Sequence, residues 1–109
     1  MQRLDVAYRP QAINDLKAIH FAIAEASQSN AVADRFVNRI MARCRKIGDA
    51  PHGGRKRDDL VVGLRSVPFE RSAIITYTVT EGRVEISNIF FSRRDYEALY
   101  RAQSKDELL

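Results

Sequence analysis

The sequence predicts an α+β domain in which a helical hairpin packs on one face of an antiparallel-rich sheet. Apolar residues recur at three- and four-residue steps in the first half, which is typical of helices. In the second half they alternate or form short runs, which is typical of strands. The expected order is β-α-α-β-β-β-α, and a length of 109 residues has room for one domain, residues 1–109.

The chain begins with a short predicted strand and a first helix. Leu4, Val6 and Tyr8 alternate with other residues, as in a half-buried strand. Pro10 follows, and proline suits the first position of a helix. The apolar side of this helix is expected to contain Ile13, Leu16, His20 and Ile23, with Ala12 and Ile19 beside them.

A polar turn at residues 27–30 separates the first helix from a second one. Asn30 is the predicted N-cap of the second helix, and Gly48 suits the position just after its end. Two helices joined by so short a turn should form an antiparallel hairpin. The apolar stripe of the second helix is expected to contain Ala33, Phe36, Ile40, Cys44 and Ile47.

Residues 49–60 have the composition of a loop, and three strand-like runs follow it. The runs cover about 61–69, 72–80 and 83–91, and Glu81-Gly82 makes a two-residue hairpin turn between the last two. Apolar residues occupy both faces of these strands. Something beyond the helical hairpin is therefore expected to cover the second face.

A short last helix is predicted at the C-terminal end of the sequence. Ser92 and Asp95 have the spacing of a helix start, and Tyr96, Leu99 and Tyr100 would share one side of the helix. We expect fraying from about residue 103 to residue 109.

Positive charge is concentrated in one segment. The formal net charge is +4, yet residues 31–57 carry eight basic and two acidic residues and the remainder sums to −2. Such a segment fits an acidic protein or a nucleic acid, although a charged stripe is more often the solvated side of a helix. The candidate anionic-partner surface consists of Arg35, Arg39, Arg43, Lys46, Arg55, Lys56 and Arg57.

The sequence offers no convincing catalytic or metal-binding set. Cys44 lies on the predicted buried stripe, where a cysteine is usually an inert core residue. His20 and His52 have no carboxylate or nucleophile at a readable spacing, so no metal and no cofactor are expected. A lone cysteine fits a reducing compartment, and neither a signal segment nor a membrane span is recognisable, so we expect a cytoplasmic protein.

Three arginines are harder to explain as solvated surface. Arg65 stands in a strand close to Leu64 and Val67, where a lone charge needs a purpose. Arg93 and Arg94 open the predicted last helix, where positive charge opposes the helix dipole. Contact with a ligand or partner explains such positions better than folding does.

Several of these segments together resemble the ParE/RelE superfamily of type II toxins, and the ParE subgroup most. The resemblance rests on the GLRSVPF segment at 63–69, the strand at 74–79, the Glu81-Gly82 turn and the run from 84 to 95. Earlier in the chain, Tyr8, Ala12 and the pair Asp15-Leu16 also match, so that about residues 3–100 are covered. One departure is Phe91, where many ParE-like sequences have histidine.

The resemblance implies a bacterial toxin held in a hetero-oligomer by a cognate antitoxin, whose extended or helical segment would wrap it. A ParE-like toxin would bind DNA gyrase so that cleaved DNA accumulates, without catalytic residues of its own. Its target-binding residues would be Arg65, Arg93 and Arg94. The candidate anionic-partner surface would then face the acidic antitoxin or a DNA-bound target.

Two alternatives stay open. A RelE-like toxin would cut mRNA on the ribosome without a metal, and the resemblance then assigns roles to Arg65, Arg94 and Tyr100. A third possibility is a nucleic-acid-binding module that uses the basic face of the second helix.

Overall fold

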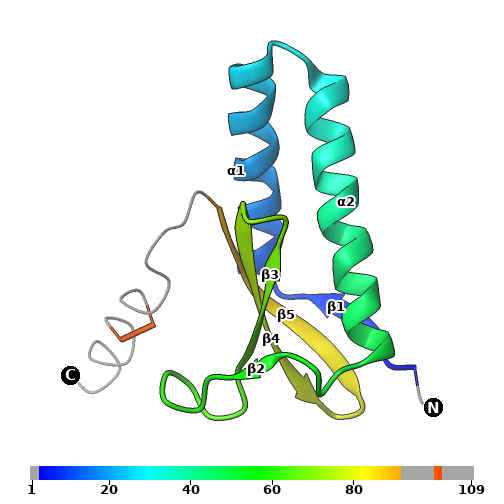
Figure 1. Cartoon of the computed structure of the whole chain (residues 1–109), viewed down its shortest axis with the longest axis vertical. Coiled ribbons are helices and arrows are strands. Elements are labelled where there is room, and N and C mark those ends of the chain that lie inside the picture. Colours follow the sequence, from blue (N-terminus) through cyan, green and yellow to red (C-terminus); the bar gives the residue numbers. More distant parts are fainter. Residues whose placement is uncertain (1–2, 92–99, 102–109) are drawn as a thin grey trace.

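Two helices and a five-stranded mixed sheet make up the computed structural model, which describes residues 3–91 and 100–101 (Figure 1). The α+β class and the helical hairpin are as predicted. The predicted last helix, apart from residues 100–101, and the frayed tail lie outside the described residues. The elements are β1 (Asp5–Tyr8), α1 (Pro10–Ser27), α2 (Asn30–Asp49), β2 (Arg55–Lys56), β3 (Arg65–Phe69), β4 (Ala73–Thr80) and β5 (Arg83–Phe91).

The strands lie in the order β1-β5-β4-β3-β2. β1 runs parallel to β5, and the other neighbours are antiparallel. The predicted two-residue turn is confirmed, because Thr80 pairs with Arg83 and both Glu81 and Gly82 have positive φ angles. No described helix combines the length and apolar character that a membrane crossing requires.

Two strand boundaries differ from the prediction. The expected loop 49–60 contains β2, which is too short to leave a periodic pattern and forms by pairing with β3. The run expected from residue 61 becomes a strand only at Arg65. Residues 57–64 instead close a turn in which the Arg57 amide donates to the Leu64 carbonyl at 2.8 Å.

The helix ends also differ. Ser29, not Asn30, is the N-cap of α2, and its side chain accepts from the Val32 amide at 3.2 Å. Gly48 lies inside α2 instead of after it. The Leu4 amide donates to the Gly48 carbonyl at 2.9 Å, and a Cβ at position 48 would overlap the carbonyl oxygen of Leu4. The glycine therefore lets β1 approach the helix.

The hairpin packs its apolar sides on one face of the sheet and projects beyond it (Figure 1). In α1 the buried residues are Ala12 and Ile19, and the prediction of a buried Ile13 was wrong, since its exposed fraction is 42%. In α2 the predicted stripe faces the core. The ring of Phe36 meets Phe69 and Phe91 edge-on, at centroid distances of 5.6 and 5.7 Å.

A bulge in β5 is held by a side chain of α1. Thr76 pairs with Asn88 but Tyr77 pairs with Ile86, which leaves one extra residue in β5. The Asp15 carboxylate accepts from the Ile89 amide at 2.9 Å and from the Asn88 side chain at 3.2 Å. This contact fixes α1 on the sheet.

The chain itself covers part of the second sheet face. A smaller core cluster on that side contains Leu60, Leu64, Phe90 and Tyr100, with Ile74 packed against it. The rings of Phe90 and Tyr100 meet edge-on at 5.8 Å. We expected something besides the hairpin to cover this face, and residues of the chain itself cover part of it.

Candidate binding surfaces

Basic residues from three elements lie near the β2 edge of the sheet. Lys56 in β2 lies directly opposite Arg65 in β3, and Arg55 lies opposite Ser66. Burial raises the pKa of Tyr77 in β4, and the nearby Arg65 and Arg43 oppose that rise. We call the residues Arg43, Arg55, Lys56 and Arg65 the basic edge.

Arg65 holds the loop that precedes β2. Its Nη1 donates to the carbonyls of His52 and Gly54 at 2.8 and 2.9 Å. The Tyr77 hydroxyl donates to the Pro51 carbonyl at 2.9 Å and accepts from the Gly54 amide at 3.0 Å. A Cβ at position 54 would overlap that hydroxyl, so only glycine fits. The charge of Arg65 thus has a structural use, and its role in target binding stays a prediction.

The other predicted basic residues have unlike environments. Arg35, Lys46, Arg55 and Lys56 are exposed. Arg39 forms two hydrogen bonds with Glu70, at 2.9 and 3.2 Å, and its guanidinium lies 5.2 Å from the ring centre of Phe36.

Arg57 is the buried member of the set. It has an exposed fraction of 4% and binds Asp59 through two hydrogen bonds, at 3.0 and 2.8 Å. Its guanidinium therefore reaches solvent far less than those of its neighbours. Whether these seven residues contact a partner stays a prediction.

Tyr100 is engaged in a polar network on the second sheet face. Its hydroxyl donates to the Asn88 side chain at 2.8 Å and lies 2.7 Å from the Thr76 hydroxyl. The exposed fraction of Tyr100 is 7%. Arg93 and Arg94 lie outside the described residues, so their proposed roles also stay predictions.

The candidate nucleophile and bases occupy structural positions. Cys44 is fully buried, and burial raises the pKa of its thiol to about 11, so the thiol stays protonated at neutral pH. The Nε2 atom of His20 lies 2.7 Å from a carboxylate oxygen of Asp34 and so joins α1 to α2. Within residues 3–91 and 100–101, no three His, Cys, Asp or Glu side chains gather as a metal site.

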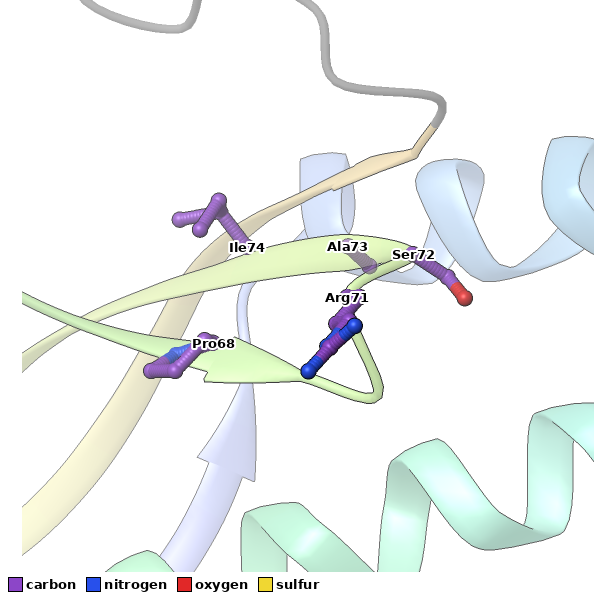
Figure 2. A pocket seen from close by; sticks show the side chains of 5 residues that line it. All are labelled: Pro68, Arg71, Ser72, Ala73 and Ile74. Carbon is purple, nitrogen blue, oxygen red and sulfur yellow. The ribbon is translucent and has the colours of Figure 1, made fainter.

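A hollow of about 290 Å³ lies beside the β3–β4 turn (Figure 2). Pro68 and Ile74 are cross-strand partners on its floor. Nothing in the sequence marks this hollow, because its charged residue belongs to a turn that contains no glycine. The lining residues are Pro68, Arg71, Ser72, Ala73 and Ile74.

Comparisons with known proteins agree with this architecture. A family model described as the ParE toxin of the type II toxin–antitoxin system parDE matches residues 6–106. The chain is similar to a chain of the chromosomal ParDE toxin–antitoxin system from P. aeruginosa, at 20% identity and a TM-score of 0.71, over 84% of this chain and 98% of that one.

A second similar structure is a chain of the YoeB-YefM complex from Staphylococcus aureus. It is 21% identical with a TM-score of 0.51, over 82% of this chain and 97% of the other. At these identities the structures show the fold alone. No curated protein sequence matches the chain significantly.

Proposed function

Because the chain belongs to the ParE toxin family of type II toxin–antitoxin systems, we propose that it inhibits DNA gyrase by binding and that a cognate antitoxin neutralises it. The toxin would act in the bacterial cytoplasm, where both partners would be found. It would act as a rigid binding module and would need neither a metal nor a cofactor.

The observation that carries the binding mode is the construction of the basic edge. Arg65 and Lys56 are cross-strand neighbours, and Arg65 is fixed by two backbone carbonyls. The cross-strand partner of Arg65 on its other side is Tyr77 in β4, and burial raises the pKa of Tyr77, so its hydroxyl is neutral at physiological pH. A pre-positioned cationic surface suits an acidic protein surface or an enzyme bound to DNA.

The geometry supports the mRNA endonuclease alternative less well. A nuclease would need Arg65 and Tyr100 to reach the RNA backbone. Instead, the Nη1 donor of Arg65 points at two loop carbonyls, and the Tyr100 hydroxyl is buried between Asn88 and Thr76. The Tyr100 hydroxyl would have to break its bonds first, whereas Arg65 would have only the N–H groups of Nε and Nη2 left for the RNA. Cleavage of ribosome-bound transcripts that depends on Tyr100 would support this alternative.

A supercoiling assay tests the proposal. Purified toxin at micromolar concentration should block supercoiling by gyrase, and equimolar antitoxin should restore it. The double variant Arg55→Glu/Lys56→Glu should inhibit at least about tenfold less, because close charge pairs across an interface contribute about 1.5 kcal/mol or more each. Lys17→Glu, an exposed change on α1, is the matched control and should inhibit like the wild type. Unaffected gyrase would contradict the proposal.

Binding to bare DNA distinguishes the proposed toxin from the third possibility, a plain nucleic-acid-binding module. A plain nucleic-acid-binding module would bind duplex DNA or RNA alone, with an affinity that falls steeply as salt is raised. The proposed toxin should inhibit gyrase at salt concentrations where it no longer binds bare DNA.

A further inference from the structure

The β3–β4 turn has an unusual backbone. Glu70 and Arg71, its two central residues, have φ angles of 45° and 58°, and the Ser72 amide closes the turn on the Phe69 carbonyl at 2.9 Å. Residues other than glycine avoid this left-handed region, at a cost of about 1 kcal/mol or more each. At the other two-residue turn, Gly82 takes one of the two positions. The β3–β4 turn instead has two charged side chains.

The side chains of Glu70 and Arg71 lie on opposite sides of the sheet. Glu70 binds Arg39 of α2, on the side of the helices, through two hydrogen bonds. Arg71 lines the hollow with Pro68 and Ile74, on the second face (Figure 2). The Glu70 contact ties the turn to α2 and so helps to place the backbone of the neighbouring Arg71.

Arg71 leaves the rim of the hollow positively charged. It is exposed, and it forms no ion pair or hydrogen bond with any residue in the described part of the chain. The adjacent carboxylate, Glu70, is already neutralised by Arg39. Below the guanidinium the floor is apolar, formed by the ring of Pro68 and the half-buried Ile74. An exposed, unpaired guanidinium beside an apolar floor favours a carboxylate that adjoins an apolar side chain.

We infer that this hollow receives an acidic-apolar segment of the cognate antitoxin, with an aliphatic or aromatic side chain on the Pro68–Ile74 floor and a neighbouring Asp or Glu on Arg71. The volume of about 290 Å³ matches one or two side chains of a peptide and lies at the lower end of small-molecule pockets. This inference rests on the proposed function, because it names a contact of the proposed antitoxin.

The position of the hollow favours the antitoxin, and not the target, as its occupant. The hollow adjoins the end of β3 on the second sheet face, whereas Arg65 begins β3 and points toward the loop on the helix side. A wrapping segment can reach the hollow while leaving the basic edge to the target. Loss of charge at Arg71 should therefore weaken neutralisation and leave inhibition of gyrase intact.

The test compares Arg71→Asn, Arg71→Glu and the charge control Lys17→Glu in the full-length toxin. Asparagine tolerates a positive φ angle, so Arg71→Asn removes the charge and keeps the turn. The probe is the antitoxin encoded in the neighbouring reading frame, titrated against each variant. We expect about tenfold weaker binding for Arg71→Asn, about a hundredfold for Arg71→Glu and no change for Lys17→Glu. Pro68→Asp should also weaken binding by placing a carboxylate on the apolar floor.

Inhibition of gyrase is the second readout. Weaker antitoxin binding together with unchanged inhibition by both Arg71 variants supports the inference. Antitoxin affinity within twofold of the wild type for Arg71→Glu overturns it while the proposed function stands. Retained antitoxin binding with lost inhibition also overturns it, because the hollow would then belong to the target. A wild-type toxin that neither binds the antitoxin nor inhibits gyrase would refute the proposed function itself.

Discussion

Replacing Tyr77 by phenylalanine removes one oxygen atom, and we predict that it lowers the free energy of unfolding by about 2 to 3 kcal/mol. The hydroxyl is shared by the Pro51 carbonyl and the buried Gly54 amide, at 2.9 and 3.0 Å. An ordinary hydrogen bond contributes about 1 kcal/mol net, and a buried amide left without an acceptor costs about 1 to 3 kcal/mol. In a domain of this size the melting temperature should fall by about 10 °C or more.

Urea unfolding of a double-mutant cycle checks this magnitude. Gly54→Ala alone should destabilise by about 1 to 3 kcal/mol, because its Cβ would overlap the Tyr77 hydroxyl. Removing the hydroxyl relieves the closest overlap, so the double variant should cost about 1 kcal/mol less than the sum of the two single changes. Tyr8→Phe is the matched control, since the Tyr8 hydroxyl bonds only weakly to the Cys44 thiol.

The loop anchor also has a functional consequence. Arg55 and Lys56 follow the anchored loop directly, so Tyr77→Phe should weaken inhibition of gyrase at temperatures where the variant is still folded. A loss below about 0.5 kcal/mol in Tyr77→Phe, or full additivity in the cycle, would show that the Tyr77 hydroxyl does not anchor the loop.

Three further changes test the packing. Gly48→Ala would stabilise an ordinary helix by about 1 kcal/mol, but here thermal unfolding should show a loss of about 1 to 3 kcal/mol, because the new methyl group would overlap the Leu4 carbonyl. Asp15→Ala should cost about 2 kcal/mol in urea unfolding, since it leaves the Ile89 amide without its acceptor. Because burial raises the pKa of Cys44 from its usual value of 9.0 to about 11, the folded protein keeps a proton that the unfolded chain has lost between these values. The free energy of unfolding should fall as the pH rises through that range, and less steeply in Cys44→Ala.

The regular part of the fold could be predicted because its periodicity is local. The α2 stripe from Ala33 to Ile47 repeats at helical spacing, and the Glu81-Gly82 turn has a turn sequence. β2 could not be predicted, since two residues carry no period and pair only because β3 lies beside them. Gly48 was misassigned for a related reason. A glycine that ends a helix and one that lets a strand approach look alike in sequence.

The candidate site was harder to predict than the fold. The sequence shows Arg65 as a lone charge in a predicted strand. Its partners are backbone carbonyls, which no pattern of side chains reveals. Tyr77 lies within the predicted strand 72–80, but its contact with Gly54 joins positions 23 residues apart in the sequence. Arg71 gave no signal at all, because a charged residue in a turn looks like ordinary solvated surface.

The most direct test of gyrase inhibition measures DNA cleavage by gyrase in the presence of purified toxin, beside cleavage of a ribosome-bound transcript by the same preparation. We expect that linear, gyrase-linked DNA accumulates with increasing toxin, that equimolar antitoxin abolishes this accumulation, and that the transcript stays intact. Intact DNA together with a cut transcript would contradict this expectation.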